Sequence, residues 1–186
     1  MAEEGIIAAR IADNTVRALT ADLAQAVLDS IRDGGTLESF RRDYASIVAA
    51  HGWSPKDSAW HSRLVYRLNT SNGFAAGRWE QAQRLDRARP GTIFARLITA
   101  GDTRVRHTHA EMQGIIRPLH DAYWDTNWPP NGFNCRCHAQ IVTQRDMTRY
   151  DWTMTPDGDP RLSVPPDPGW AYNPGKVGAR AAAASP

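Results

Sequence analysis

The first half of the chain carries hydrophobic residues at helical spacing, three or four positions apart. One run ends at Gly34-Gly35, and Thr36 is placed to cap a second run that ends at His51-Gly52. Because each run gives one apolar face, the pattern predicts two amphipathic helices. Their faces consist of Val16, Leu19, Leu23, Val27 and Ile31, and of Leu37, Phe40, Tyr44, Ile47 and Val48.

A third helical pattern begins near Ser58 and stops before Pro90. The polar stretch 69–73, which ends in a glycine, predicts a break or a kink within it. We therefore expect two helical segments rather than one. Their apolar residues are Trp60, Leu64, Val65, Leu68, Phe74, Trp79 and Leu85.

The pattern changes after the third helix, where short apolar and β-branched runs begin. Residues 92–99, 114–117 and 137–143 are strand candidates, and residues 103–112 predict a short helix that carries two histidines. Three short strands predict a small antiparallel sheet.

The last part of the chain is rich in proline, with seven of the 12 prolines from Tyr150 onward. Residues 165–175 cannot form a regular helix or a central strand, because proline lacks the backbone N–H. We expect an extended arm that is ordered by docking of Trp170 and Tyr172, followed by a frayed or weakly helical tail over 179–186.

Together these patterns predict the α+β fold class. An N-terminal helical region (1–90) is followed by a small antiparallel sheet domain (91–150) and an extended Pro-rich C-terminal arm (151–186). A length of 186 residues suits one domain, or one domain with a small helical partner.

Composition and charge argue against membranes, and against strong binding to nucleic acid, as partners. The net charge is only +2, so the attraction of the whole molecule to nucleic acid is weak. No apolar run approaches the length of a membrane span, and the acidic start lacks the features of a signal peptide. We expect a protein that stays in the cytoplasm or is packed into a particle assembled there, with no membrane partner.

The most informative segment is residues 102–137, which we call the clasp. It contains the only two cysteines, Cys135 and Cys137, whose spacing is strained for a disulfide. Together with His109 they can hold a zinc ion, since zinc accepts Cys and His ligands. The alternative is two small buried residues that tie a loop. Candidates for the remaining ligand are His107, His120 and His138.

Charged residues of the clasp allow two interpretations. His109 can act as a general base oriented by Asp102, or the two can belong to a structural network. Arg104, Arg106 and Arg136 can clamp a phosphate or carboxylate, or form local salt bridges. Structural ion pairs are commoner than catalytic ones, so the structural interpretation is favoured for His109 and Asp102, and both alternatives stay open for the arginines.

Aromatic and proline residues give the clasp its stiffness. Trp124 and Trp128, with Pro129 and Pro130, predict a rigid hydrophobic cover over the sheet. Gly132 is predicted to supply a turn with positive φ. These residues are interpreted as packing rather than as a ligand platform.

Taken together, the clasp resembles the phage Mu F-like minor head protein family, also known as a head-morphogenesis family. The similarity spans about residues 60–175 and includes the segment 168–175 of the arm. The residues that carry it are Asp102, Arg104, Arg106, His109, Gly114, Trp124, Pro129, Pro130, Gly132, Asn134, Cys135, Arg136 and Cys137.

The resemblance implies a non-enzymatic virion protein, present in few copies near the portal or inside the phage head. It implies contacts with portal, capsid or scaffold proteins, and with packaged DNA. Some relatives carry cysteines where Arg106 and His109 stand and a histidine where Gly132 stands, which looks like a fuller metal site. In this chain His109, Cys135 and Cys137 are the ligands that this resemblance leaves.

Two alternative functions remain open from the sequence. One is a zinc-dependent hydrolase or nuclease that uses His109 and Asp102, with Arg104 and Arg136 steering phosphate. The other is a DNA-binding accessory protein in packaging that uses the arginine-rich stretch 78–106.

Overall fold

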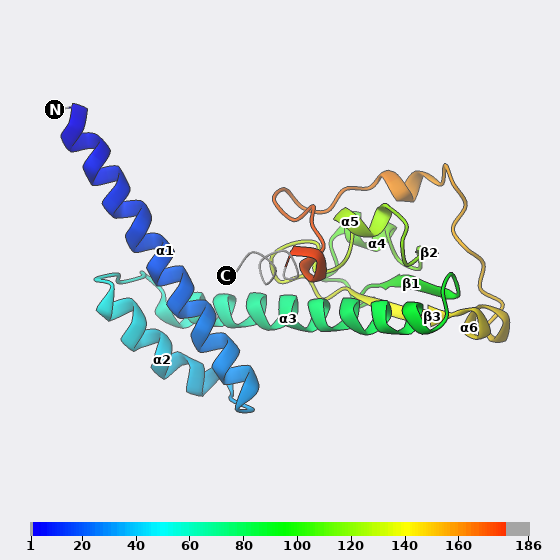
Figure 1. Cartoon of the computed structure of the whole chain (residues 1–186), viewed down its shortest axis with the longest axis horizontal. Helices are drawn as coiled ribbons and strands as arrows, with labels where there is room; N and C mark the ends of the chain where they lie inside the picture. The colour runs from blue at the N-terminus through cyan, green and yellow to red at the C-terminus, as the bar shows by residue number, and fades with distance from the viewer. Residues whose placement is uncertain (1, 178–186) are drawn as a thin grey trace. The chain divides into compact units, whose positions relative to one another are not determined.

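The computed structural model describes residues 2–177, with side chains from residue 16 onward. The tail predicted over 179–186 lies outside the described residues. None of the described helices is long and apolar enough to cross a membrane. The elements are α1 (Ala2–Arg32), α2 (Leu37–Ala50), α3 (Ser58–Ala88), β1 (Ile93–Ile98), α4 (His107–Glu111), β2 (Ile116–Pro118), α5 (Tyr123–Thr126), β3 (His138–Thr143), α6 (Gln144–Arg149) and the 3-10 helix η1 (Pro160–Ser163). Figure 1 labels the α-helices and the strands.

The chain divides into two compact units. We call Met1–Thr70 the helical unit and Ser71–Pro186 the sheet unit. Their boundary falls inside α3, whereas the sequence pattern places the first boundary after residue 90. The helices and the small antiparallel sheet together confirm the α+β class.

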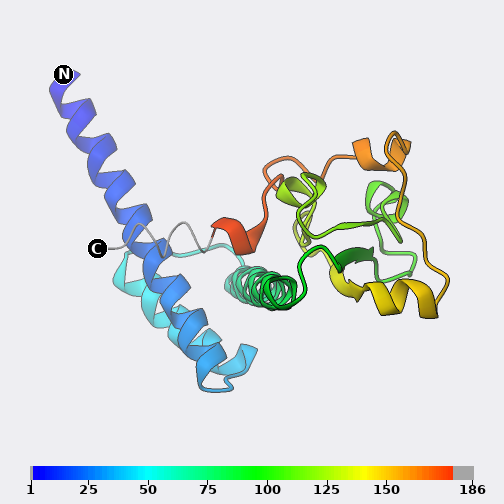
Figure 2. The same ribbon diagram turned by 45° about the vertical axis from the view of Figure 1, so that its right-hand side comes forward.

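The helical unit is built on the antiparallel hairpin of α1 and α2, which Figure 2 shows in blue and cyan. The two predicted helices are confirmed, and Thr36 is the N-cap of α2. Thr36 and Ser39 form a reciprocal capping box, which satisfies backbone N–H groups at the helix start. The buried residues of the hairpin core are Leu23, Val27, Phe40, Tyr44 and Val48.

α3 is one continuous helix, so the predicted break over 69–73 is wrong. The side chains of Asn69 and Thr70 donate hydrogen bonds to the carbonyls of Val65 and Tyr66, one turn earlier. These polar side chains therefore bond within the helix instead of competing with it. A single glycine costs a helix only about 1 kcal/mol, which the neighbouring turns can absorb.

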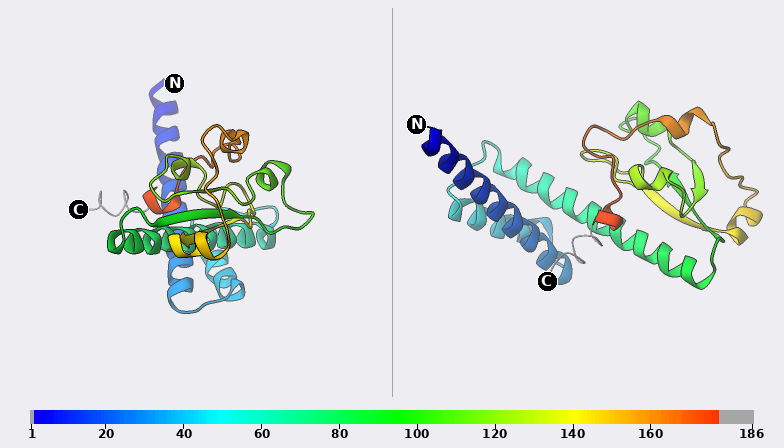
Figure 3. Two further views of the ribbon diagram at one scale, coloured as in Figure 1. Left: turned by 90° about the vertical axis from the view of Figure 1, so that its right-hand side faces the viewer. Right: turned by 45° about the horizontal axis from the view of Figure 1, so that its top comes forward.

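The sheet has the order β2-β1-β3, and both pairs are antiparallel. Figure 3 shows β3 lying beside β1 along its length. Ala95 of β1 faces Arg117 of β2 and Ile141 of β3 in this register. All three predicted strands are confirmed, and Pro118 sits at the end of an edge strand, where its missing N–H is tolerated.

A cluster of tryptophans forms the centre of the sheet unit. Trp124 and Trp128 are fully buried, and their rings meet edge to face with centroids 5.5 Å apart. Trp79 of α3 meets Trp128 in the same way at 4.9 Å. The indole of Trp128 donates to the carbonyl of Ala75, so its polar atom is also satisfied. The predicted hydrophobic cover is therefore part of the core itself.

The C-terminal arm, orange to red in Figure 2, packs on the clasp. Trp170 is buried and meets the ring of Phe133 edge to face at 5.2 Å. Asn173 is also buried and donates to the carbonyl of Trp124. The arm is thus held by specific contacts although most of it forms no helix or strand.

Candidate metal centre

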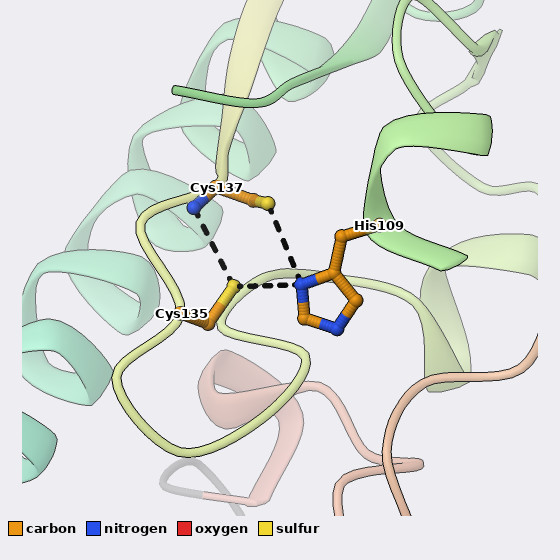
Figure 4. A group of neighbouring side chains, drawn as sticks. All are labelled: His109, Cys135 and Cys137. Carbon is orange, nitrogen blue, oxygen red and sulfur yellow. Dashed lines mark hydrogen bonds between the residues drawn. The ribbon is translucent and has the colours of Figure 1, made fainter. Parts of the chain in front are cut away.

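Three donor side chains meet in the clasp (Figure 4). His109 comes from the short helix α4, while Cys135 and Cys137 come from the loop that leads into β3. The Nδ1 atom of His109 lies 3.6 Å from Sγ of Cys135 and 3.8 Å from Sγ of Cys137. All three donor atoms lie within 4.8 Å of one another.

The two nitrogen–sulfur distances match an edge of a tetrahedral zinc site. With Zn–S bonds of about 2.3 Å and Zn–N bonds of about 2.05 Å, a sulfur and a nitrogen ligand stand about 3.6 Å apart. The two observed S–N distances, 3.6 and 3.8 Å, agree with that edge. Two thiolates and one imidazole are also ligand types that zinc prefers. The donor set therefore fits the metal in both chemistry and spacing.

The two thiols titrate as a pair. A hydrogen bond with Cys137 is the main reason that the pKa of Cys135 falls, to about 4, and a hydrogen bond with His109 adds to the effect. The same bond with Cys135, together with burial, raises the pKa of Cys137. Cys135 is therefore the thiol that loses its proton more readily, and a thiolate is the form of cysteine that binds a metal.

The other side of the imidazole faces the C-terminal arm. The Nε2 atom of His109 is buried and makes no hydrogen bond in the described part of the chain. Its charged neighbour there is Asp167, whose Oδ1 lies 3.4 Å away. A hydrogen bond with Cys135 is the main reason that the pKa of His109 is raised. Asp167 thus stands where the sequence interpretation placed Asp102.

None of the other candidate histidines joins this group among residues 16–177. His107 is 91% exposed and pairs with Glu111, and His120 pairs with Asp86. His138 follows directly after Cys137 but is not part of the ligand cluster. Beside the donors lies an opening of about 20 Å³, which is large enough for one water molecule. The site thus offers three protein ligands and a small open space.

Asp102 anchors the clasp by binding arginines. Both of its carboxylate oxygens accept hydrogen bonds from Arg136, each at 2.6 Å, and Arg104 approaches at 3.3 Å. The bond with Arg136 is the main reason that the pKa of Asp102 falls below its ordinary value. Arg106 instead donates to the carbonyl of Phe133 and pairs with Asp167. The arginines predicted to clamp an anion therefore make local ion pairs, the structural alternative.

The turns of the clasp depend on particular backbone conformations. Gly114 has a φ of 78°, and Asn134, an amino acid that tolerates this region, has a φ of 55°. The prediction that Gly132 supplies a positive φ is wrong. A Cβ at Gly132 would overlap with the carboxylate of Asp167, so the close approach of the arm requires glycine there. The peptide bond between Pro129 and Pro130 is cis.

A family model described as phage Mu protein F-like protein matches residues 21–140. This range covers well over half of the chain and includes the whole clasp. The chain belongs to the phage Mu protein F-like family. The resemblance seen in the clasp residues is therefore confirmed.

Two curated proteins of phage or prophage origin are similar in sequence to this F-like chain. It is 25% identical over 191 aligned residues to "Putative capsid assembly protein F" of Escherichia phage Mu, covering 80% of this chain and 43% of that protein. It is 28% identical over 82 residues to "Mu-like prophage FluMu F protein" of Haemophilus influenzae, covering 44% of this chain and 19% of that protein. The chain thus spans less than half the length of either relative. No solved structure matches it significantly.

Sequence reasoning missed Asp167 as a member of the site. The residue lies in the arm, beyond the range that the F-like family model matches. A signal did exist, because Gly132 lies beside the cysteines and a glycine there can mark a close approach of another segment. The sequence alone did not indicate which segment approaches.

Proposed function

We propose that this chain is a minor capsid and head-morphogenesis protein of a tailed phage or a prophage-derived particle. Its work is done by contacts with portal, capsid or scaffold proteins near the portal or inside the head. Membership of the phage Mu protein F-like family carries this proposal. The name of the phage Mu relative, a capsid assembly protein, supports the same role.

A groove in the helical unit supports a role in protein–protein contact. It has a volume of about 630 Å³ and lies between α1, the loop after α2 and the start of α3. Val16 is 60% exposed and Trp53 is 37% exposed at its edge. Exposed apolar surface of this kind is typical of sites that bind another protein. We propose that another head protein covers it in the particle.

We further propose that the clasp binds a zinc ion through His109, Cys135 and Cys137. The observation that supports this is the agreement of the two nitrogen–sulfur distances with a tetrahedral set, in a cluster of three zinc-type donors. When bound, zinc would cross-link α4 to the loop before β3 and so stiffen the clasp. The role is structural, because Asp102 pairs with Arg136 and Arg104 rather than with His109.

The head-protein proposal is tested by quantitative mass spectrometry of purified particles. We expect the chain to co-sediment with filled heads at a fixed, low ratio to the portal protein. Its absence from heads, with the chain free in the lysate, would contradict a virion role and favour an assembly factor or the enzyme alternative.

The groove is tested by variants in the same particles. Val16→Asp puts a charge on the rim of the groove, so we expect incorporation of the chain into heads to fall. Lys56→Ala is the matched control, since Lys56 is exposed nearby and does not line the groove. Equal incorporation of both variants would remove the groove from the proposal.

The zinc site is tested by native mass spectrometry and elemental analysis of the full chain. We expect one zinc per chain for the wild type and loss of zinc in Cys135→Ser. His107→Ala is the control, because that histidine is exposed and outside the ligand cluster. A wild-type chain that retains no zinc after titration would contradict the proposal.

The two alternative functions make different predictions for the same preparations. A hydrolase or nuclease would lose activity in His109→Ala while keeping its fold. A DNA-binding protein would show affinity that falls steeply with salt concentration. The structure favours neither, since Arg84, Arg104 and Arg106 of the arginine-rich stretch pair with carboxylates.

A further inference from the structure

The C-terminal arm crosses the clasp beside its ligand cluster. The N–H of Asp167 donates to the carbonyl of Asn131 at 2.9 Å, which fixes the arm at this point. The carboxylate of Asp167 then occupies the space that a side chain at position 132 would need. Gly132 is thus the residue that lets the carboxylate reach the ligand cluster from the arm.

An arginine contacts the carboxylate of Asp167, and neighbouring contacts hold its backbone. Its Oδ2 lies 3.3 Å from Nε of Arg106, which is itself tied to the carbonyl of Phe133. The N–H of Trp170 donates to the carbonyl of Asp167, and the Trp170 ring packs on Phe133. The side chain is only 25% exposed. Such a carboxylate is positioned by the fold rather than free in solvent.

The imidazole of His109 is oriented between this carboxylate and the sulfurs. Its Nδ1 faces both thiols, and its fully buried Nε2 faces Oδ1 of Asp167 at 3.4 Å. A histidine that binds a metal through one nitrogen usually donates the N–H of the other to a carboxylate or carbonyl. This partner fixes the tautomer, so that the free lone pair points toward the metal.

We propose that Asp167 is a positioning residue for the metal site, accepting the Nε2–H of His109 so that Nδ1 binds the metal together with Cys135 and Cys137. This inference rests on the proposed zinc site. It makes metal affinity depend on docking of the C-terminal arm, since the arm alone supplies this carboxylate. Displacement of the arm by a head protein would then weaken metal binding.

The test is titration of the metal-free full chain with Co²⁺, which reports ligand geometry through its visible spectrum. We expect Asp167→Ala to weaken Co²⁺ binding about 10- to 100-fold and to alter the spectrum. Asp167→Asn keeps an oxygen acceptor and is expected to recover part of the loss. Asp157→Ala is the matched control, because Asp157 is an arm carboxylate that pairs with Arg117 instead.

A second variant, at Gly132 in the clasp, disturbs the same carboxylate without changing Asp167 itself. Gly132→Ala displaces the Asp167 side chain, so it should reproduce the loss of affinity without changing any donor or carboxylate. Melting of the metal-free Asp167→Ala protein measures whether that variant merely loosens the fold, whereas Gly132→Ala is itself expected to melt earlier because of the collision. An affinity loss that Asp167→Asn recovers, at an unchanged melting midpoint, supports a positioning role.

The outcomes distinguish a failure of the proposed role of Asp167 from a failure of the proposed metal site. If the wild type binds Co²⁺ and Asp167→Ala binds it with the same affinity and spectrum, the role of Asp167 is overturned and the metal site stands. If the wild type binds no Co²⁺, the metal site is overturned and this inference falls with it.

Discussion

The helical unit and the sheet unit are stabilised by different kinds of contact. In the helical unit an apolar stripe joins α1 to α2, and its polar contacts are the local capping box of Thr36 and Ser39 and a few long-range bonds such as His51 with Asp22. The sheet unit combines a tryptophan core with polar contacts between distant segments, such as Asp102 with Arg136 and Asp167 with His109. The helical unit therefore rests mainly on an apolar helix hairpin, whereas the sheet unit adds a tryptophan core and ion pairs that close long loops.

The largest difference between the units is expected in the free energy of unfolding when a tryptophan is replaced. Trp128→Ala should lower the free energy of unfolding by about 3–5 kcal/mol, because it leaves a cavity between Trp79 and Trp124. Trp60→Ala in the helical unit should change it by less than about 0.5 kcal/mol, since Trp60 is 55% exposed. Chemical denaturation followed by near-UV circular dichroism measures both. Equal losses would contradict the comparison.

The next effect concerns ion pairs. The largely buried side chain of Arg117 binds Asp121, Asp157 and the carbonyl of Thr155. Arg117→Met should cost about 3 kcal/mol, because it leaves the poorly exposed carboxylate of Asp121 unpaired.

The helical unit offers the matched control for that ion pair. Arg32 pairs with Asp29 in solvent, where their side chains are 72% and 47% exposed. Removing such a pair costs about 0.2–1 kcal/mol, and high salt reduces it further. Urea unfolding at two salt concentrations checks the contrast, and a loss in Arg32→Ala as large as that in Arg117→Met would contradict it.

A smaller effect is expected at the contact between the clasp and the arm. Gly132→Ala should cost about 1–3 kcal/mol, because the new methyl group collides with Asp167. Asp167→Gly should relieve the collision, so the double variant should lose less than the sum of the two single variants. Thermal melting of the four proteins measures this coupling. Strict additivity would show that the two residues do not meet.

The smallest expected effect is a difference in the pH dependence of the stability that the two capping boxes contribute. In α6 the box joins Thr143 to Asp146, and hydrogen bonds from Thr143 lower the pKa of Asp146. A lowered folded-state pKa stabilises above the unfolded value of about 3.9, and the stabilisation is lost as the pH falls through the folded value. Asp146→Asn should therefore cost less than about 1 kcal/mol at neutral pH and nothing in strong acid.

The box of the helical unit contains no titrating side chain. Ser39→Ala should therefore cost the same in acid and at neutral pH, since Thr36 and Ser39 are both hydroxyl residues. Denaturant midpoints of both variants across pH measure the difference. A cost for Asp146→Asn that persists in acid would contradict the role of its charge.

The elements that could be predicted from the sequence are those whose information is local. The helical period and the cap at Thr36 determined α2, and the strands β1 and β3 followed from short apolar runs. The break in α3 was predicted wrongly because Asn69 and Thr70 bond within the helix, which spacing does not reveal.

The candidate site could be predicted only in part. His109, Cys135 and Cys137 were identified as possible ligands from their residue types, and the structure places them together. Asp102 was one candidate for a carboxylate that orients His109, whereas the carboxylate that lies beside His109 in the structure is Asp167 of the arm. Gly132 marks a close approach at this point, but no local pattern indicates which distant segment approaches.

The most direct test of the account is hydrogen exchange with mass spectrometry on the full chain, with and without Zn²⁺. The proposed zinc site predicts that zinc slows exchange in α4 and in the loop 132–137, which carry the donors, and in the arm around Asp167, which lies beside His109. Exchange in the hairpin of α1 and α2 should stay unchanged, since no donor lies there. Unchanged exchange in the clasp on adding zinc would contradict the account.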